Sequence, residues 1–252
     1  MKQTSCWARL RSALLAATFL ALLAVALSAR QAQAGRATQA TPINSDIVGD
    51  TTWSIAGSPY QVTAPIRITN TATLTIEAGV EITFAAGAGL RVEGGLNAQG
   101  TQARQVRMVG DNGAIWQGLT AAQPTRNLAL QSVTIQNALA GLAIRQQTTP
   151  IVATSGRVDV LNSLLLNNRI GIDADYSVLA NAPRLIMRNN LLTNNQIGLQ
   201  LNGLPSGNIK SKFNHNSFVG NGIGVNAINI SGNGVEMQQQ WWGSPDGPLA
   251  DP

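Results

Sequence analysis

VLNSLLLNNRIGI (residues 160–172) and MRNNLLTNNQIGL (residues 187–199) share one pattern, and this pattern decides the fold. It recurs at four glycines that lie 30, 27 and 26 residues apart: Gly141, Gly171, Gly198 and Gly224. Apolar residues stand one residue after each glycine, six before it and eleven before it. These three columns are Leu142, Ile172, Leu199 and Val225; Ile135, Leu165, Leu192 and Phe218; and Leu130, Val160, Met187 and Phe213. A repeat of this length indicates units that bury their apolar faces by stacking on one another.

Polar residues recur between the apolar columns. The three polar columns are Ser132, Asn162, Asn189 and His215; Asn168, Asn195 and Asn221; and Asn137, Asn167 and Asn194. Asn tolerates the left-handed backbone of a tight corner, and stacked Asn side chains can hydrogen-bond to one another. We therefore expect three short strands in each unit, separated by Asn-rich turns and one longer variable loop.

The segments between the turns have the alternation of strands. Residues 73–76, 80–84 and 90–93 alternate apolar with polar side chains, which is typical of half-buried strands. No stretch after residue 34 sustains a helical period, so helices cannot connect the strands of a parallel sheet. The sequence predicts an all-β fold, a single-stranded parallel β-helix with three short strands per coil. Parallel crossover connections are generally right-handed, and we expect a right-handed solenoid.

The columns resemble the repeats of right-handed parallel β-helix proteins of the pectin-lyase-like superfamily. Residues 58–60, 74–80 and 95–101 look like the opening coils of its secreted bacterial members, and residues 241–248 contain the Trp-Trp-Gly-Ser-Pro motif that often follows their last coils. The superfamily includes lyases, hydrolases, epimerases and non-catalytic surface proteins. The resemblance therefore implies the fold and does not select an activity.

Residues 1–34 have the character of a secretory signal peptide. Lys2, Arg9 and Arg11 precede an uncharged run over residues 12–29, and Ala32-Gln33-Ala34 offers a cleavage site between small residues. An uncleaved anchor is the alternative, because the run is about long enough to span a bilayer. Cleavage would leave a chain without a membrane segment that is secreted or extracytoplasmic, in the periplasm or at the cell surface.

The remaining chain divides into two parts. Residues 35–52 are expected to form a polar lead, and residues 53–252 the β-helix domain with a C-terminal Trp-Trp cap. Trp53, and Trp241 with Trp242, stand at opposite ends of the repeats. We expect them to cover the exposed edges of the solenoid rather than to stack on sugar rings.

Charge and cysteine content narrow the possible partners. The net charge of +5 falls to +1 without the four basic residues of the first segment, because 13 basic residues then face 12 acidic ones. A chain so close to neutral lacks the charge that nucleic-acid binding requires. Cys6 lies in the first segment and His215 is the single histidine, so neither a disulfide framework nor a His-rich metal site is expected. We expect no resident cofactor.

Acidic residues suited to sugar chemistry are few. Asp173 and Asp175 form the one close acidic pair inside the repeats and alternate along one predicted strand, with Asp159 in the same coil. Lyases of the superfamily gather carboxylates around Ca²⁺ and use Arg or Lys as base, whereas its hydrolases pair two carboxylates.

The pattern assigns no catalytic residue. Asp173, Asp175 and His215 are the candidates that an enzyme would use, and Ca²⁺ is expected only for a lyase. The alternative is that the two aspartates belong to a solvated strand face. His215 would then replace a corner Asn and hydrogen-bond along the stack.

A column of cations stands fourteen residues before successive repeat glycines. It contains Arg157, Arg184 and Lys210, with Asn127 at the same position one coil earlier. The columns thirteen and eleven before each glycine face inward, so these cations should point to solvent on one face. Such a ladder could bind an extended anionic chain, although Asp159 would partly neutralise Arg157. Alternatively, each cation covers an apolar neighbour and keeps the surface soluble.

From these features we predict a secreted, monomeric and non-catalytic β-helix protein. Its rigid surface would bind a polysaccharide or a cell-envelope glycan through Arg157, Arg184 and Lys210. Two alternatives stay open: a polysaccharide lyase or hydrolase acting on uronate-containing glycans, and a structural module of a larger surface system.

Overall fold

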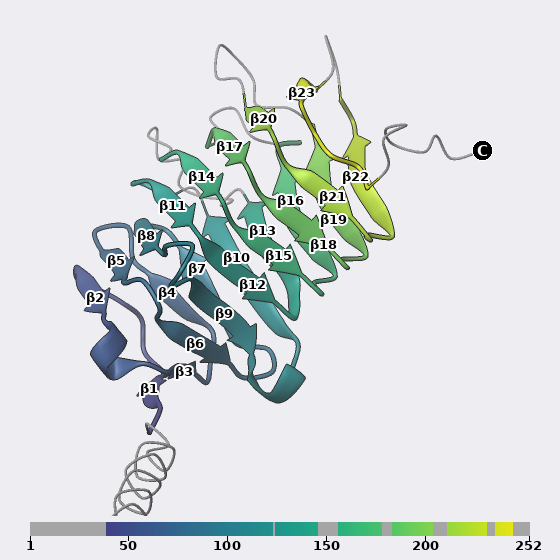
Figure 1. Ribbon diagram of the computed structural model, residues 1–252. Coiled ribbons are helices and arrows are strands. Elements are labelled where there is room, and N and C mark those ends of the chain that lie inside the picture. The colour runs from purple at the N-terminus through teal and green to yellow at the C-terminus, as the bar shows by residue number, and fades with distance from the viewer. Residues whose placement is uncertain are drawn as a thin grey trace, which may run out of the picture. The chain divides into compact units, whose positions relative to one another are not determined.

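The protein is a parallel β-helix of about six turns (Figure 1). The computed structural model describes residues 39–122, 124–145, 156–177, 183–203, 211–230 and 235–243. Helical structure in these ranges is limited to two 3-10 turns, η1 (Ile55–Gly57) and η2 (Asp111–Gly113). The predicted all-β solenoid with three short strands per coil is confirmed.

Three parallel sheets form the walls of the solenoid, and the chain enters them in a fixed order in each coil: sheet C, then sheet A, then sheet B. Sheet A contains β1 (Thr41–Ile43), β3 (Tyr60–Val62), β6 (Glu81–Phe84), β9 (Val106–Gly110), β12 (Val133–Gln136), β15 (Leu164–Leu166), β18 (Leu191–Thr193) and β21 (Ser217–Val219). Sheet B contains β4 (Ile66–Ile68), β7 (Gly89–Val92), β10 (Trp116–Ala122), β13 (Ala138–Arg145), β16 (Ile170–Asp175), β19 (Ile197–Asn202) and β22 (Ile223–Ile228). Sheet C contains β2 (Thr51–Trp53), β5 (Thr73–Ile76), β8 (Gly95–Gln99), β11 (Leu128–Gln131), β14 (Val158–Leu161), β17 (Leu185–Arg188), β20 (Lys212–Asn214) and β23 (Met237–Gln238).

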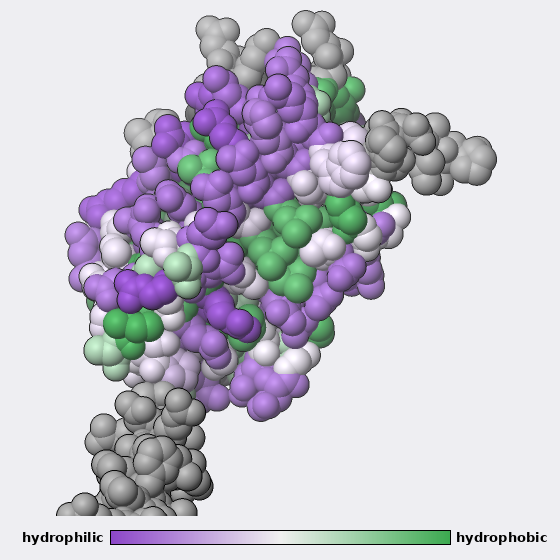
Figure 2. All heavy atoms as spheres, viewed as in Figure 1, coloured by the Kyte–Doolittle hydropathy of each residue, from purple (hydrophilic) through white to green (hydrophobic). Residues whose placement is uncertain are grey.

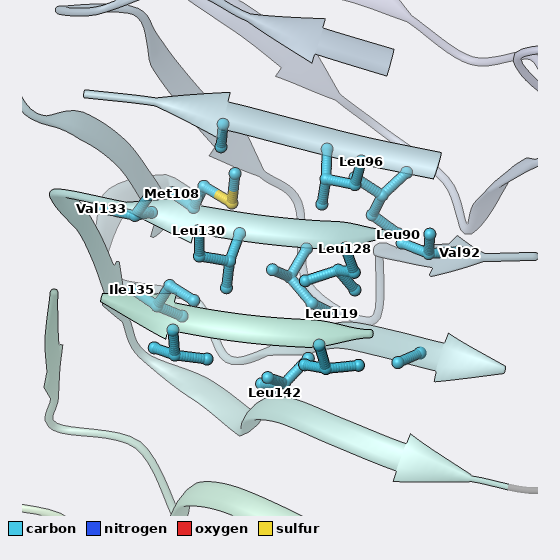
Figure 3. Close-up of a cluster of buried hydrophobic side chains, with 14 of the residues drawn as sticks. Leu90, Val92, Leu96, Met108, Leu119, Leu128, Leu130, Val133, Ile135 and Leu142 are labelled. Atoms are coloured by element: carbon cyan, nitrogen blue, oxygen red, sulfur yellow. The ribbon is translucent and has the colours of Figure 1, made fainter. Parts of the chain in front are cut away.

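The pairing register brings the predicted apolar columns into direct contact. Leu165 pairs with Ile135 of the coil before and with Leu192 of the coil after, and Phe218 extends the column. All four side chains are buried. Figure 3 shows the same arrangement earlier in the solenoid, where apolar side chains from all three sheets point into one shared interior: Met108 and Ile135 from sheet A, Leu90 and Leu119 from sheet B, and Leu96 and Leu130 from sheet C.

The polar columns form the corners between sheets. Ser132, Asn162, Asn189 and His215 have φ angles of 50°, 51°, 56° and 55° at the turn from sheet C to sheet A. Asn137, Asn167 and Asn194 have φ angles of 61°, 54° and 54° at the turn from sheet A to sheet B. These values lie in the left-handed region, where Asn carries a smaller penalty than most residues. The predicted role of Asn at the corners is therefore confirmed.

A ladder of buried Asn side chains joins the coils beside the second corner. The Oδ1 atom of Asn195 accepts hydrogen bonds from the backbone N–H (2.9 Å) and the Nδ2 atom (3.1 Å) of Asn168. Its Nδ2 atom donates to the carbonyl of Leu165 (3.0 Å) and to Oδ1 of Asn221 (2.9 Å). Each side chain thus satisfies backbone groups of the preceding coil.

A second ladder lies beside the first corner. Asn190 Oδ1 accepts the N–H of Ser163 (2.9 Å), and Asn190 Nδ2 donates to Val160 O (2.7 Å) and Asn216 Oδ1 (2.9 Å). Gln240 ends the ladder by accepting the N–H of Asn216 (3.0 Å). The sequence signal for this ladder is a polar residue eight positions before Gly171, Gly198 and Gly224, a column that the three polar columns described above do not include.

The repeat glycines allow the coils to approach closely. A Cβ atom on Gly141, Gly171 or Gly198 would lie 2.7, 2.5 or 2.6 Å from the carbonyl oxygen of the next glycine in the column. Side chains at these positions would push neighbouring coils apart. The glycine column therefore reflects strand spacing rather than a positive φ angle.

Aromatic side chains pack near both ends of the solenoid. Trp53 is buried and stacks on Tyr60 with ring centroids 4.9 Å apart, and Trp242 stacks on Phe218 at 5.2 Å, whereas Trp241 is exposed. Strand pairing begins at Thr41. The segment expected to be a polar lead therefore contributes the first strands of sheets A and C.

Replacing Asn195 with Ala should destabilise the protein by on the order of 3 kcal/mol. The change leaves the buried N–H of Asn168 and the carbonyl of Leu165 without their partners, and each buried unsatisfied group costs about 1–3 kcal/mol. Urea unfolding measures the effect. The control is Asn214→Ala in β20, which should change the free energy of unfolding by no more than about 0.5 kcal/mol. Equal stability of both variants would contradict the structural role of the ladder.

Candidate binding face

The predicted cationic column lies at the start of successive strands of sheet C. Val158 of β14 pairs with Leu185 of β17, so Arg157 and Arg184 occupy equivalent positions immediately before them. The N–H of Arg157 donates to Asn127 Oδ1 (3.0 Å), and the carbonyl of Arg184 accepts from Val158 (2.9 Å). Val158 and Leu185 are buried, so the arginines point outward. Lys210, the third predicted member, lies outside the described residues.

Asp159 binds one of these arginines. Its Oδ2 atom accepts from Nε and Nη2 of Arg157, both at 2.7 Å. The Asp159 side chain is 9% exposed and that of Arg157 is 52% exposed. The expected neutralisation of Arg157 is therefore present. The other carboxylate oxygen of Asp159, Oδ1, and the Nε atom of Arg184 are both buried, and neither has a hydrogen-bond partner in the part of the chain that the structure describes.

Two further cations share the outward face of sheet C. Arg188 ends β17 and Lys212 begins β20, and both are exposed. Lys212 is in register with Ile186, which is in register with Asp159. Among the described residues neither cation forms an ion pair. We call Arg157, Arg184, Arg188 and Lys212 the sheet C cationic face.

Sequence reasoning missed Arg188 and Lys212 because it examined a single offset from the repeat glycine. Arg188 stands ten residues before Gly198, and Lys212 twelve before Gly224. Residues fourteen, twelve and ten positions before a repeat glycine are two apart in the strand, so their side chains all lie on its outward face. Examining the three offsets together would have found the face.

The neighbouring sheet limits this face on one side. The outward positions of β15 and β18 hold Leu164, Leu166 and Leu191, of which Leu191 is 39% exposed. Figure 2 shows the contrast, with hydrophilic residues over β14, β17 and β20 and an apolar area over β15 and β18. In these coils the outward face of sheet A is therefore apolar beside the sheet C cationic face.

Asp173, one of the catalytic candidates, lies on β16 of sheet B with its oxygens engaged. Arg145 donates to Oδ2, Gln200 Nε2 donates to Oδ1 (3.1 Å), and Arg145 Nη1 also donates to the Asp173 carbonyl (2.9 Å). The side chain is buried. The expectation of a freely solvated strand face is therefore wrong for Asp173, because the long Arg145 side chain covers it from the coil before.

The Asp175 carboxylate accepts hydrogen bonds from Ser177, two residues further along the chain, and from Asn202. Its Oδ1 atom accepts from the N–H (3.0 Å) and hydroxyl (2.7 Å) of Ser177 and from Nδ2 of Asn202 (3.0 Å). Burial acts to raise the pKa of Asp175, but the Ser177 hydrogen bonds, Arg145 and Asn202 outweigh it and leave the pKa below its ordinary value. These contacts give both aspartates structural partners and bring neither to the sheet C cationic face.

His215 takes the corner position that its column predicts, with φ of 55°. Its side chain is exposed. Asn189 Nδ2 donates to Asn162 Oδ1 (3.2 Å) in the same column, but no described residue hydrogen-bonds to the imidazole. His215 thus replaces a corner Asn as expected, without continuing the side-chain hydrogen bonds along the stack.

The described ranges contain neither a metal-binding cluster nor a membrane-spanning helix. No group of three or more His, Cys, Asp or Glu side chains that could hold a metal ion occurs in the described part of the chain. Nor does this part contain a helix with the length and apolar character needed to cross a bilayer.

Comparisons of the chain with protein-family models, curated proteins and solved structures found no match.

Replacing Ser177 with Ala should raise the pKa of Asp175 toward its ordinary value, because the change removes the Ser177 hydroxyl, the group that lowers this pKa most, and keeps the backbone N–H. A lowered pKa stabilises the folded state above the unfolded value, which is about 3.9. This contribution is lost as pH falls through the folded pKa, and the variant should have less of it at neutral pH. NMR titration of the carboxyl carbon gives the pKa. An unchanged value would contradict the assignment of Ser177 as the main partner.

Proposed function

We propose that this protein is a secreted, non-catalytic β-helix that binds an acidic polysaccharide along the sheet C cationic face. The observation that carries this proposal is the placement of Arg157, Arg184, Arg188 and Lys212 on one outward face, where Asp159 is the one carboxylate that forms an ion pair with them among the described residues. Four cationic side chains on one face of a sheet favour a ligand that carries repeated negative charge.

The geometry of the face suits an extended polymer. Neighbouring strands in a sheet lie about 4.8 Å apart, so cations from successive coils repeat along the solenoid axis at that spacing. Guanidinium groups can donate two parallel hydrogen bonds to a carboxylate. A uronate polymer presents carboxylates at regular intervals, and its chain would run along the axis across β14, β17 and β20.

The Arg157–Asp159 pair contributes to this function by fixing one guanidinium. Both contacts of Arg157 go to a single oxygen of Asp159, which orients the arginine while its remaining N–H groups stay free for a ligand. Arg184, Arg188 and Lys212 would then supply most of the unneutralised charge.

Two further parts of the proposal rest on sequence. The repeat columns and the Trp-Trp-Gly-Ser-Pro motif support membership of the pectin-lyase-like superfamily with a right-handed coil. The composition of residues 1–34, which lie outside the described residues, supports export from the cytoplasm. An extracytoplasmic location would bring the cationic face into contact with envelope or environmental glycans.

Combining Arg184→Gln, Arg188→Gln and Lys212→Gln should weaken binding to polygalacturonate at least about tenfold, or about 1.4 kcal/mol. Binding by the unmodified protein should also weaken as salt rises, because screening acts over about 8 to 10 Å at moderate ionic strength. Isothermal titration calorimetry at low salt measures the affinity. The fold should persist, because Arg188 and Lys212 are exposed and Arg184 is half-buried, and substitutions at such surface positions seldom change stability by more than about 0.5 kcal/mol each.

The matched control is the combination Arg104→Gln, Arg107→Gln and Arg169→Gln, which removes the same charge from exposed positions outside sheet C. It should bind polygalacturonate as the unmodified protein does, and neither variant should differ toward a neutral glucan. Equal losses in both variants would show that net charge, not the face, determines binding. Release of unsaturated product during the titration would instead favour a lyase.

A further inference from the structure

Three Asn-Gly dipeptides lie within the described residues: Asn112-Gly113, Asn202-Gly203 and Asn221-Gly222. In such a dipeptide the backbone nitrogen of the glycine can attack the side-chain carbonyl carbon of the asparagine, which deamidates the asparagine. Glycine favours this reaction because it has no side chain to hinder the approach and lets the backbone rotate into the reactive geometry. The contacts of each dipeptide in the folded protein therefore decide whether it can react.

Asn202 is held by its side chain and by its backbone. Its Nδ2 atom donates to Asp175 Oδ1 (3.0 Å), and its Oδ1 atom accepts from Asn229 Nδ2 (2.7 Å). The N–H of Gly203, which would be the attacking group, donates to the carbonyl of Ile228 (2.9 Å). Asn202 also lies in β19, which is paired on both sides. Deamidation at this position would first require sheet B to open locally.

Asn221 is held in the buried ladder beside the second corner. Its Oδ1 atom accepts from the N–H (3.0 Å) and Nδ2 (2.9 Å) of Asn195, and its Nδ2 atom donates to the carbonyl of Leu192 (2.8 Å). The N–H of Gly222 donates to the carbonyl of Asn195 (3.0 Å). Both reacting groups are therefore engaged at this dipeptide as well, and the coil must open before they can meet.

Asn112-Gly113 lacks these restraints. The dipeptide lies in the turn between β9 and β10, which the N–H of Ala114 closes by donating to the carbonyl of Asp111 (2.8 Å). Both residues of the dipeptide are exposed, and the Asn112 side chain forms no hydrogen bond with a described residue. A Cβ atom on Gly113 would have no atom within 4 Å. The space that the reaction needs is therefore open.

We propose that Asn112 is a site of spontaneous deamidation, and that the fold protects Asn202 and Asn221 from the same reaction. The Gly113 nitrogen forms a bond to Cγ of Asn112 and loses its proton, and the bond from Cγ to Nδ2 breaks. Nδ2 leaves as ammonia, which takes up that proton. Water then opens the resulting succinimide ring at either carbonyl and produces aspartate or isoaspartate.

Both products change the turn between sheets A and B. Each adds a negative charge next to Asp111, whose Oδ2 atom accepts from Gln61 Nε2 (3.2 Å). Isoaspartate also inserts the side-chain methylene into the backbone, so the spacing between Asp111 and Ala114 changes. The turn lies outside sheet C, and the inference does not rest on glycan binding.

Peptide mapping of the folded protein during incubation at mildly alkaline pH tests the inference. Trypsin releases residues 108–126, a peptide in which Asn112 is the one asparagine, and mass spectrometry after chromatography separates its aspartate and isoaspartate forms. Asn112 should react at least about tenfold faster than Asn202 and Asn221. In guanidinium chloride the three should react at similar rates, because each is followed by glycine and no fold protects any of them.

A pair of variants tests the role of Gly113. Gly113→Ala should slow deamidation of Asn112 at least about tenfold, because the added methyl group hinders the attacking nitrogen. The matched control is Gly87→Ala. Gly87 and Gly113 have similar φ angles, 74° and 78°, and neither has an atom within 4 Å of a Cβ position. The control therefore introduces the same backbone strain and should leave deamidation of Asn112 unchanged.

Any of three results would overturn the inference. One is that Asn112 reacts no faster than Asn202 or Asn221 in the folded protein. Another is that Asn112 keeps the same advantage in guanidinium chloride, because the sequence rather than the fold would then set the order. The last is equal slowing by Gly113→Ala and Gly87→Ala, which would trace the effect to backbone strain.

Discussion

The structure depends on the hydrogen bonds by which each coil satisfies the buried backbone of its neighbour. Turning the chain sharply between sheets places N–H and carbonyl groups inside the solenoid, where a missing partner is costly. Asn195 accepts a hydrogen bond from the N–H of Asn168 and donates one to the carbonyl of Leu165. It also donates to Asn221, which continues the ladder into the next coil. Because a ladder works only if coils stay in register, the same bonds also fix the apolar columns.

Fixed register explains how a chain with few charges can create a charged surface. Residues with the same parity in equivalent strands must stand next to one another, so cations spaced about one repeat apart in sequence become neighbours in space. Arg157 and Arg184 meet in this way on sheet C. On sheet A the same rule gathers Leu164 and Leu191, and the two faces differ sharply in polarity.

The columns of the fold follow from the sequence because they express one repeat with a constant period. The same periodicity predicts left-handed backbone at corners such as Asn162 and His215. Contacts that a long side chain makes with a neighbouring coil could not be predicted from the repeat. Arg145 covers Asp173 across 28 residues, and this depends on the length and direction of one arginine. The ends were not predicted, since among the described residues β1 at Thr41 and β22 each pair with a strand on one side only.

The most direct measurement is a crystal structure of the protein with an oligogalacturonate. The proposed function places the sugar chain along the solenoid axis over β14, β17 and β20, with carboxylates at Arg184, Arg188 or Lys212. A sugar chain bound instead on sheet B beside Asp173 and Asp175, or at the aromatic end near Trp241, would contradict it.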